Sequence, residues 1–433
     1  MSAKLQKQLK QSLVWRGLYF IVAFATTVIT SRVLKAEATG EFTYLISFLS
    51  FFVLSFGLNL DSGITYFTSS KLITSKKSLE IGFAWIILIS FISSLLFSSN
   101  FYGNIINIKN AQINVYECSM YYLIGLLMIN YSMSLFYGFK NFKTPNIILI
   151  AASLIYFILI RYRLVNKANV HSIIEDFCKM NFVAGFLLIV TFLIIYSKKD
   201  KFELPTLNDL KQLFSYSIVS LTSNLVFFFV YRIDYWFVKH WCNNDVAMGN
   251  YLQVSKFGQI ILVIPQILAS AIFPQIANSN QKGDVVDIIG RLLRLLTAFF
   301  VLLFFVVLIL GKSFFPWLLG ESFNQMYLPM LIIIPGIYFL ALSSLFSAYF
   351  SGTKNNKINL YGALVAITIT LILSFCLQHY YTIKIAALIS TISYIAESVF
   401  VGLVFKKMEK ITVSDIVFLK SNDLKWLVQT LQG

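Results

Sequence analysis

The sequence predicts an all-α integral membrane protein with about 12 transmembrane helices, arranged as two parallel six-helix lobes around a central cavity. Three observations support this fold class. Of the 433 residues, 58% are hydrophobic and only 12% are charged, a composition typical of chains that cross a bilayer repeatedly. Basic residues gather on alternate connections, and two short motifs recur at nearly the same offset.

Apolar runs long enough to cross a membrane follow one another from one end of the chain to the other. A helix needs about 20 consecutive apolar residues to cross the hydrocarbon core. Hydropathy on this scale gives twelve spans, which are centred on Ala23, Leu54, Ile89, Leu127, Leu154, Leu188, Leu225, Leu262, Val301, Pro335, Ile369 and Ile395.

The net charge of +16 is explained by membrane topology and does not indicate nucleic acid as a partner. If the N-terminus is cytoplasmic, 23 of the 35 Lys and Arg residues fall in inside loops and tails, and 10 fall in outside loops. Cytoplasmic loops carry the excess of Lys and Arg in membrane proteins. We therefore expect both termini to be cytoplasmic. The connection over residues 161–179 is an exception, with four cations on the predicted outside.

Two motifs repeat at matching positions of the predicted spans. The connections after the fourth and tenth spans share the pattern G-x-K-N-x-K, starting at Gly138 and at Gly352, an offset of 214 residues. Those after the first and seventh spans read ATGEF from Ala38 and AMGNY from Ala247, an offset of 209 residues. Six spans separate the matched positions, so both copies enter the membrane in the same direction. The sequence therefore predicts parallel repeats.

The duplication divides the chain into an N-terminal lobe over residues 1–196 and a C-terminal lobe over 213–406. A cytoplasmic linker over 197–212, rich in Lys and containing Pro205, joins them. The cytoplasmic tail over 407–433 alternates apolar and polar residues at helical spacing, which is typical of an interfacial helix. Parallel repeats predict a substrate site at the lobe interface and alternating access by rocking of one lobe against the other.

Catalytic and metal-binding motifs are missing from the sequence. A glycine at Gly311 begins what looks like the end of a phosphate-binding loop, but the glycine required five positions earlier is Val306. The four cysteines have no paired spacing that suggests a metal or redox site. The three histidines lie in predicted outside loops (His171, His240 and His379). We therefore expect no enzyme, no metal and no cofactor, and any energy would come from an ion gradient or the membrane potential.

Two opposite charges, Arg232 and Asp234, interrupt the seventh span, which has no others over residues 213–237. Spans seven and eight form a hairpin whose turn centres near Asn244, so residues equidistant from the turn lie at similar depth. Arg232 and Lys256 are both twelve residues from it. Asp234 is two residues shallower, roughly 3 Å along a helix, which long side chains can cover. The depth argument predicts an ion pair between Asp234 and Lys256, with Arg232 as the surplus cation.

Two explanations of these intramembrane charges stay open. Charged side chains at bilayer depth face the bundle interior or a wet cavity, and they mark a transport path or a structural ion pair. In the functional explanation, Arg232 and Lys256 form a cationic site in the outward half of the cavity, suited to a diphosphate or an acidic sugar. In the structural explanation, the charges only pair between helices.

Five further residues are candidates for contact or coupling. Arg16, at the cytoplasmic end of the first span, would meet an incoming phosphate or reach the lipid headgroups. Asp61 in the second span would have a coupling role or a helix-end role. Glu397, near the middle of the twelfth span, would be a protonatable coupling group or an inert buried carboxyl. Lys140 and Lys354 hold the same place in the repeated motif and are candidate contacts in the cytoplasmic loops.

Several passages carry a family resemblance over nearly the whole chain. They are SRVL from Ser31 followed by ATGEF, RID from Arg232 followed by GNY, IP and FPQ in the eighth span, and GTKN from Gly352. In order and spacing these resemble the polysaccharide or O-antigen flippases, Wzx-like members of the MOP (multidrug/oligosaccharidyl-lipid/polysaccharide) exporter superfamily. Lipid II flippases and MATE drug exporters belong to the same superfamily.

The resemblance implies a V-shaped cavity that moves undecaprenyl-diphosphate-linked oligosaccharide from the cytoplasmic to the outer leaflet of the bacterial inner membrane. The process would be driven by an ion gradient or potential and would serve the synthesis of lipopolysaccharide O-antigen or another surface polysaccharide. Membrane lipid, a polysaccharide polymerase and a chain-length regulator would be its partners. Lys256 falls where related lipid II flippases carry a cavity arginine, which favours contact with the substrate headgroup.

Three alternatives remain beside this prediction. A lipid II-type flippase usually has fourteen spans, so twelve spans favour an oligosaccharide flippase. A MATE-like cation or drug exporter is disfavoured because the first lobe has no metal-like acidic cluster. A membrane-embedded polysaccharide polymerase or acyltransferase would be expected to show a long outside loop or an intramembrane His and Asp pair, and neither is visible in the sequence.

Overall fold

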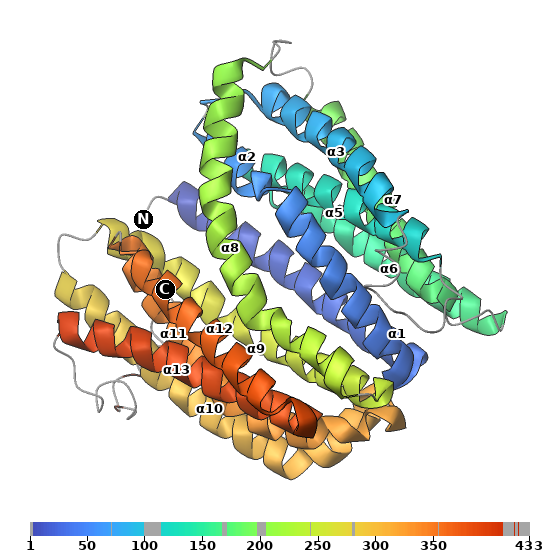
Figure 1. Cartoon of the computed structure of the whole chain (residues 1–433). Coiled ribbons are helices and arrows are strands. Elements are labelled where there is room, and N and C mark those ends of the chain that lie inside the picture. Colours follow the sequence, from blue (N-terminus) through green and yellow to red (C-terminus); the bar gives the residue numbers. More distant parts are fainter. Residues whose placement is uncertain are drawn as a thin grey trace. The chain divides into compact units, whose positions relative to one another are not determined.

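The computed structural model is built of helices over the residues that it describes (Figure 1). Eleven of the described helices are long and apolar enough to cross a membrane. Each of the twelve predicted span centres lies in one of them, so the predicted all-α fold class is confirmed. The model describes residues 3–70, 72–98, 114–166, 171–196, 205–242, 244–278, 282–353, 355–409, 420 and 423.

The chain divides into two compact units. Unit 1 comprises Met1–Leu34 and Glu41–Leu225, and unit 2 comprises Lys35–Gly40 and Val226–Gly433. In order along the whole chain, the first helices are α1 (Ala3–Phe56), α2 (Leu60–Ser69), α3 (Ser75–Phe97), α5 (Val115–Gly138), α6 (Lys143–Val165), α7 (His171–Tyr196) and α8 (Leu207–Trp241). The remaining elements are α9 (Asp245–Asn278), α10 (Lys282–Leu319), η1 (Glu321–Met326), α11 (Tyr327–Gly352), α12 (Lys357–Cys376), η2 (Gln378–Tyr380) and α13 (Ile383–Glu409).

Helix α1 contains two spans rather than one. Its apolar part covers 43 residues, which as one straight helix would be roughly 65 Å long, about twice the thickness of the hydrocarbon core. Lys35 breaks the helix with a left-handed φ of 58° and a ψ of 178°. The chain reverses its direction there (Figure 1). Eleven helices therefore accommodate the twelve predicted spans.

The duplicated sequence has a counterpart in the packing of the two units. In unit 1, α5 packs against α7, α2 and α3, and in unit 2, α11 packs against α13, α9 and α10. These two are the most buried of the membrane-spanning helices, since 67% of the apolar stretch of α5 and 61% of that of α11 is buried. Both end at the glycine that starts a G-x-K-N-x-K motif, Gly138 or Gly352. The repeated motif therefore follows the central helix of each unit.

The other repeated motif brings two glycines together within unit 2. A Cβ atom on Gly40 would lie 2.8 Å from the backbone nitrogen of Gly249, and one on Gly249 would lie 1.8 Å from the carbonyl oxygen of Ala36. Ser322 fixes the same region, because its hydroxyl accepts the Ala36 N–H at 3.1 Å and its carbonyl accepts the Asn250 side-chain amide at 3.0 Å. The matched glycines thus allow the two copies of the motif to touch backbone to backbone.

The second span of unit 1 is interrupted between α1 and α2. Leu58 and Asn59 have left-handed φ angles of 49° and 53°, which are costly for a residue with a Cβ, above all for leucine. The freed carbonyls are satisfied by side chains from other helices. Trp85 donates its indole N–H to the Phe56 carbonyl at 2.7 Å, and Tyr131 donates its hydroxyl to the Gly57 carbonyl at 3.0 Å. Two partners from different helices therefore support this break.

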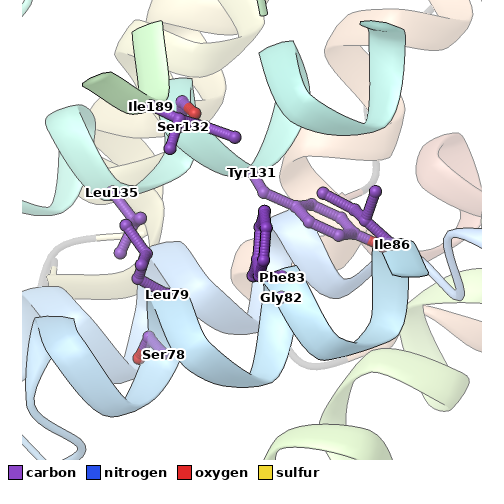
Figure 2. Close-up of a pocket in the computed structure, with 9 residues that line it drawn as sticks. All are labelled: Ser78, Leu79, Gly82, Phe83, Ile86, Tyr131, Ser132, Leu135 and Ile189. Carbon is purple, nitrogen blue, oxygen red and sulfur yellow. The ribbon is translucent and has the colours of Figure 1, made fainter. Parts of the chain in front are cut away.

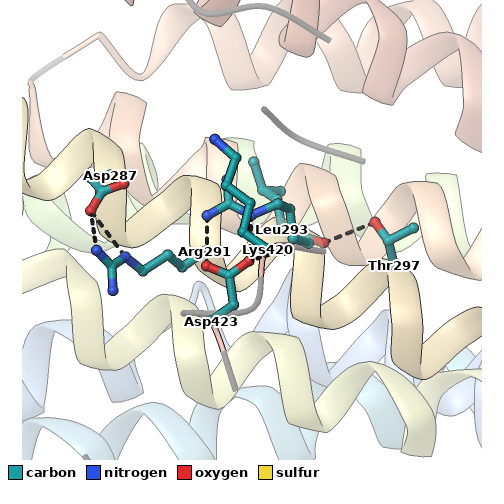
Figure 3. Close-up of polar contacts among 7 residues, drawn as sticks. Asp287, Arg291, Leu293, Thr297, Lys420 and Asp423 are labelled. Carbon is teal, nitrogen blue, oxygen red and sulfur yellow. Dashed lines mark hydrogen bonds and ion pairs between the residues drawn. The ribbon is translucent and has the colours of Figure 1, made fainter. Parts of the chain in front are cut away.

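A buried ion pair ties the described part of the C-terminal tail to α10 through Asp423, which Figure 3 shows beside Lys420. Arg294 donates Nε and Nη2 to the two carboxylate oxygens of Asp423, at 2.6 and 2.8 Å. The side chains are only 4% and 2% exposed. The Lys420 N–H also donates to Asp423 at 2.9 Å. The hydrogen bonds from the Arg294 guanidinium, with that N–H, lower the pKa of Asp423 below its ordinary value of 3.8.

Parts of the predicted linker and tail lie outside the described residues. These are the linker residues 197–204, the tail residues 410–419, 421–422 and 424–433, and the candidate contact Lys354. Residues 207–212, assigned to the linker from the sequence, form the first turns of α8. Thr206 caps that helix, since its hydroxyl accepts the Asp209 N–H at 3.2 Å.

Substituting Gly249 by alanine tests the contact between the repeated motifs. The added methyl group has no room against the Ala36 carbonyl, so we expect Gly249→Ala to destabilise the protein by about 3 kcal/mol and to lower its yield in detergent. Gly17→Ala is the matched control, because nothing lies within 4 Å of a Cβ there. Melting temperature and recovery of monodisperse protein are the measurements. Equal stability of the two variants would contradict the close contact.

Breaking the Arg294 and Asp423 pair should release the tail. A charge-assisted hydrogen bond of this kind contributes about 2 kcal/mol, so in Asp423→Asn we expect trypsin to cleave at Lys420 at least about tenfold faster. Because the folded pKa of Asp423 is lowered, its contribution is present at neutral pH and is lost only as the pH falls below about 4. Asp287→Asn, which breaks the exposed Arg291 pair at 2.8 Å, is the control and should leave the cleavage rate unchanged.

Candidate functional site

Arg232, Asp234 and Lys256 lie in unit 2, on α8 and α9, and their side chains have different environments. Asp234 is 3% exposed. Arg232 and Lys256 are partly exposed, as is Gln259 one turn beyond Lys256. The accessible charged groups of this cluster are therefore the cations, and the carboxylate is enclosed.

Asp234 joins α8 to α9 and α13 through hydrogen bonds. Its Oδ2 accepts the Tyr251 hydroxyl of α9 at 2.5 Å and the Ser390 hydroxyl of α13 at 3.4 Å. Its Oδ1 accepts the N–H of Tyr235 at 3.0 Å. A buried carboxylate is costly without such donors, and here three donors share it. The carboxylate therefore has a structural role within unit 2.

The predicted ion pair between Asp234 and Lys256 is wrong for the described residues, because the Asp234 carboxylate is bonded to Tyr251 and Ser390 and forms no salt bridge with Lys256. The depth argument placed the two residues at similar heights but did not fix the direction in which each points. Tyr251 and Lys256 are five residues apart on α9, which rotates them by roughly 140° about the helix axis. A carboxylate that faces Tyr251 thus faces away from Lys256.

Arg232 takes part in a second polar group between α8 and α9. Its Nη2 donates to the Gln259 side-chain oxygen at 3.0 Å. The guanidinium carbon lies 5.3 Å from the centroid of the Tyr235 ring, within the range of a cation–π contact. Gln259 in turn donates to the Tyr235 hydroxyl at 3.5 Å. These contacts orient a partly exposed guanidinium within the polar group.

Glu397 on α13 is enclosed in unit 2. Its side chain is 3% exposed, and its Oε2 atom has no hydrogen-bond partner among the described residues. Tyr394 lies one turn earlier on α13, and its ring centroid is 6.4 Å from that of Tyr231 on α8. The structure therefore places Glu397 in the same unit as Arg232 and Asp234. Its predicted coupling role remains a prediction.

The predicted candidates of unit 1 lie at two places. Asp61 is in the first turn of α2, where a negative charge interacts favourably with the helix dipole. Arg16 lies with its guanidinium carbon 5.7 Å from the centroid of the Tyr137 ring. Lys140 follows Tyr137 at the end of α5 and has an exposed side chain and a left-handed φ of 59°. Arg16 and Lys140 are thus brought to the same end of α5, and Asp61 is separate.

The sequence argument missed the polar partners that orient the charges. Tyr251, Ser255 and Gln259 recur every four residues along α9, so they form a polar stripe on one side of an apolar span. That periodicity was available in the sequence. Ser390 carried no comparable signal, because it is one of four small hydroxyl residues between positions 390 and 398 of α13.

Two cavities in the described structure are too small or too apolar to be the main site. One, between α3, α5 and α7 in unit 1, has a volume of about 20 Å³ and is lined by residues such as Phe83, Tyr131 and Leu135 (Figure 2), so it holds at most a water molecule. The other is a groove of about 300 Å³ between α10 and α11 in unit 2. Its polar groups, Thr297 and Tyr338, bond to each other at 2.9 Å.

No group of three or more His, Cys, Asp or Glu side chains that could hold a metal ion occurs among the residues that the structure describes. Asp234 and Glu397 are the buried carboxyls of the cluster in unit 2, and hydroxyl donors surround the former.

Comparison with solved structures assigns the fold. The chain is similar to the MATE transporter VcmN of Vibrio cholerae in its bent form, with a TM-score of 0.63 and 14% identity over 96% of this chain and 99% of that one. It is equally similar to the lipid II flippase MurJ, with a TM-score of 0.64 and 14% identity over 96% and 92% of the two chains. The chain has the fold of MOP-superfamily transporters.

A third similar structure carries the superfamily name itself. It is a MOP superfamily transporter from Pyrococcus furiosus, with a TM-score of 0.55 and 11% identity over 94% of this chain and 95% of that chain. No protein-family model matches the sequence. A comparison with curated proteins also finds no match. With eleven candidate membrane helices, the chain is a multi-pass membrane protein of this fold.

A double-mutant cycle tests the tie between Asp234 and Tyr251. Tyr251→Phe removes a donor to a buried carboxylate, which should lower the free energy of unfolding by about 2 kcal/mol. In an Asp234→Asn background the same substitution should cost clearly less, because the acceptor is no longer charged. Tyr327→Phe, which loses an exposed hydrogen bond to Leu308, is the control. Additive effects in melting experiments would argue against a direct bond.

Proposed function

We propose that the protein is a flippase that moves an undecaprenyl-diphosphate-linked oligosaccharide across the bacterial inner membrane. Transfer would run from the cytoplasmic to the outer leaflet by alternating access, coupled to an ion gradient, for synthesis of O-antigen or another surface polysaccharide. The proposal places both termini in the cytoplasm. The polysaccharide polymerase and chain-length regulator expected from the family resemblance would act on the product.

The observation that supports this proposal is the accessible cationic group of unit 2. Arg232, Lys256 and Gln259 are partly exposed on helices of membrane-spanning length. Charge at bilayer depth is costly unless it faces a polar cavity or a partner. A guanidinium held by Gln259 over the Tyr235 ring is oriented for an anionic group. A lipid diphosphate has the matching charge and presents several acceptor oxygens.

A MATE-like cation exporter is the second candidate, supported by the similarity of fold to VcmN. Cation export would favour accessible carboxylates. In the described part of unit 2, the intramembrane carboxyls Asp234 and Glu397 are each 3% exposed, whereas Arg232 and Lys256 are partly exposed. A lipid II-type flippase shares the anionic lipid chemistry, so the glycan is the property that separates it from the proposal.

Neutral substitutions of the two cations test the proposal. In a strain that depends on this chain for its surface polysaccharide, we expect Arg232→Gln and Lys256→Gln each to reduce polymer export at least about tenfold, the scale of one charge-assisted hydrogen bond. Arg232→Lys should keep part of the activity, because the charge remains but the planar fork is lost. The amount of protein in the membrane is measured in parallel.

The control for these variants is Arg161→Gln, which removes an exposed cation from α6. It should export polymer normally. If the Arg232→Gln protein is present in the membrane and folded normally, and export of the polymer is unchanged, the anion-binding role is wrong. If the protein disappears from the membrane, the arginine is structural. Export of organic cations by the wild-type protein in vesicles, unaffected by lipid-linked glycan, would favour the MATE-like candidate.

A further inference from the structure

A polar patch lies in unit 1, on α2 and the first half of α8. Thr222, Ser223 and Asn224 are exposed at the middle of α8, a helix of 35 residues. Polar groups at the middle of a spanning helix are disfavoured against hydrocarbon and are found where the protein lines water or a ligand path. The position of these three consecutive polar residues therefore points to a wet surface on unit 1.

The interrupted span supplies the other half of this patch. Asn59, which has the left-handed backbone at the break, accepts a hydrogen bond from the Asn224 amide at 3.0 Å and donates one to Ser62 at 3.0 Å. Non-helical backbone at membrane depth is tolerated where it is enclosed by protein or lines a cavity. Strained backbone of this kind is concentrated at ligand sites and hinges. The break thus directs an amide cluster to the exposed face of α8.

Two tyrosines extend the patch by about two turns. The rings of Tyr66 on α2 and Tyr216 on α8 are stacked, with centroids 4.9 Å apart and planes 11° apart. They are 46% and 41% exposed. Close packing of the two helices holds the pair in place, because a Cβ on Gly63 would lie 2.5 Å from the Ser217 hydroxyl. A fixed aromatic surface therefore adjoins the amide and hydroxyl groups.

We propose that this patch, formed by Ser62, Tyr66, Tyr216, Ser223 and Asn224 and held in place by the buried Asn59, binds the glycan part of the substrate. Sugars present hydroxyl groups that pair with amides and serine hydroxyls, and their C–H faces pack on aromatic rings. The patch has no basic side chain among these six residues, so its chemistry suits neutral sugar rings rather than a diphosphate. The inference rests on the proposed function and concerns the sugar part of the substrate alone.

The test compares two probes on the purified full-length protein in nanodiscs. The first is undecaprenyl diphosphate, and the second is the lipid-linked repeat unit extracted from the host strain. For Tyr66→Leu, Tyr216→Leu and Asn224→Ala, we expect affinity for the glycosylated lipid to fall about tenfold, the scale of one aromatic or hydrogen-bonded contact. Affinity for undecaprenyl diphosphate should stay within about twofold of the wild-type value. Tyr66→Phe keeps the ring and should bind like the wild type.

Tyr162→Leu is the matched control, because Tyr162 is a 62% exposed tyrosine of unit 1 on α6. It should bind both probes normally. Equal affinity of the patch variants and the wild type for the glycosylated lipid would overturn the glycan site and leave the proposed function standing. Equal losses for the two probes would also overturn it, since they would indicate a role in lipid contact or folding. If the wild-type protein binds neither probe, the proposed function itself fails.

Discussion

The bond from Tyr251 to Asp234 determines the character of the charged cluster in unit 2. It encloses the carboxylate between α8, α9 and α13, so the one acidic residue near Arg232 in α8 is committed to holding helices together. Had the carboxylate faced Arg232 or Lys256 instead, the charges would have neutralised one another, and the accessible surface would have been weakly polar. With Asp234 enclosed, the partly exposed groups are the Arg232 guanidinium, the Lys256 side-chain nitrogen and the Gln259 amide. The anion-binding role proposed for this cluster depends on this arrangement.

Hydropathy and the internal repeat predicted the fold well because both depend on properties that the sequence carries directly. The span centres depend on apolar length, and the motifs at Gly40 and Gly249 mark a backbone contact that only glycine permits. The site was harder to predict because it depends on the direction in which each side chain points around its helix axis, as well as on its depth in the membrane. Arg232 and Asp234 are two residues apart on α8, and no hydropathy argument decides which residue of α9 each of them meets. The polar stripe of α9 would have given that direction.

The break in the second span was missed for a different reason. Its residues, Gly57, Leu58 and Asn59, include no proline, and the surrounding run is apolar enough to be continued as one helix. The conformation is stabilised by distant side chains, since Trp85 and Tyr131 donate hydrogen bonds to the carbonyls that the break leaves without a helical partner. Those partners are 29 and 74 residues away in the sequence. Local propensity cannot register such tertiary support.

Duplication gave both units the same central helix, but the copies have diverged where polar chemistry is concerned. In unit 1, the helix that follows the first motif is broken at Leu58 and Asn59, whereas its counterpart α9 in unit 2 continues from Asp245 to Asn278. The break gives unit 1 neutral amides and a fixed tyrosine pair. The unbroken α9 gives unit 2 one continuous helix that carries both Lys256 and Gln259, and Gln259 accepts a hydrogen bond from Arg232. The two copies of the repeat thus present different polar groups, neutral amides in unit 1 and a guanidinium bonded to Gln259 in unit 2, and at these positions they are no longer symmetric.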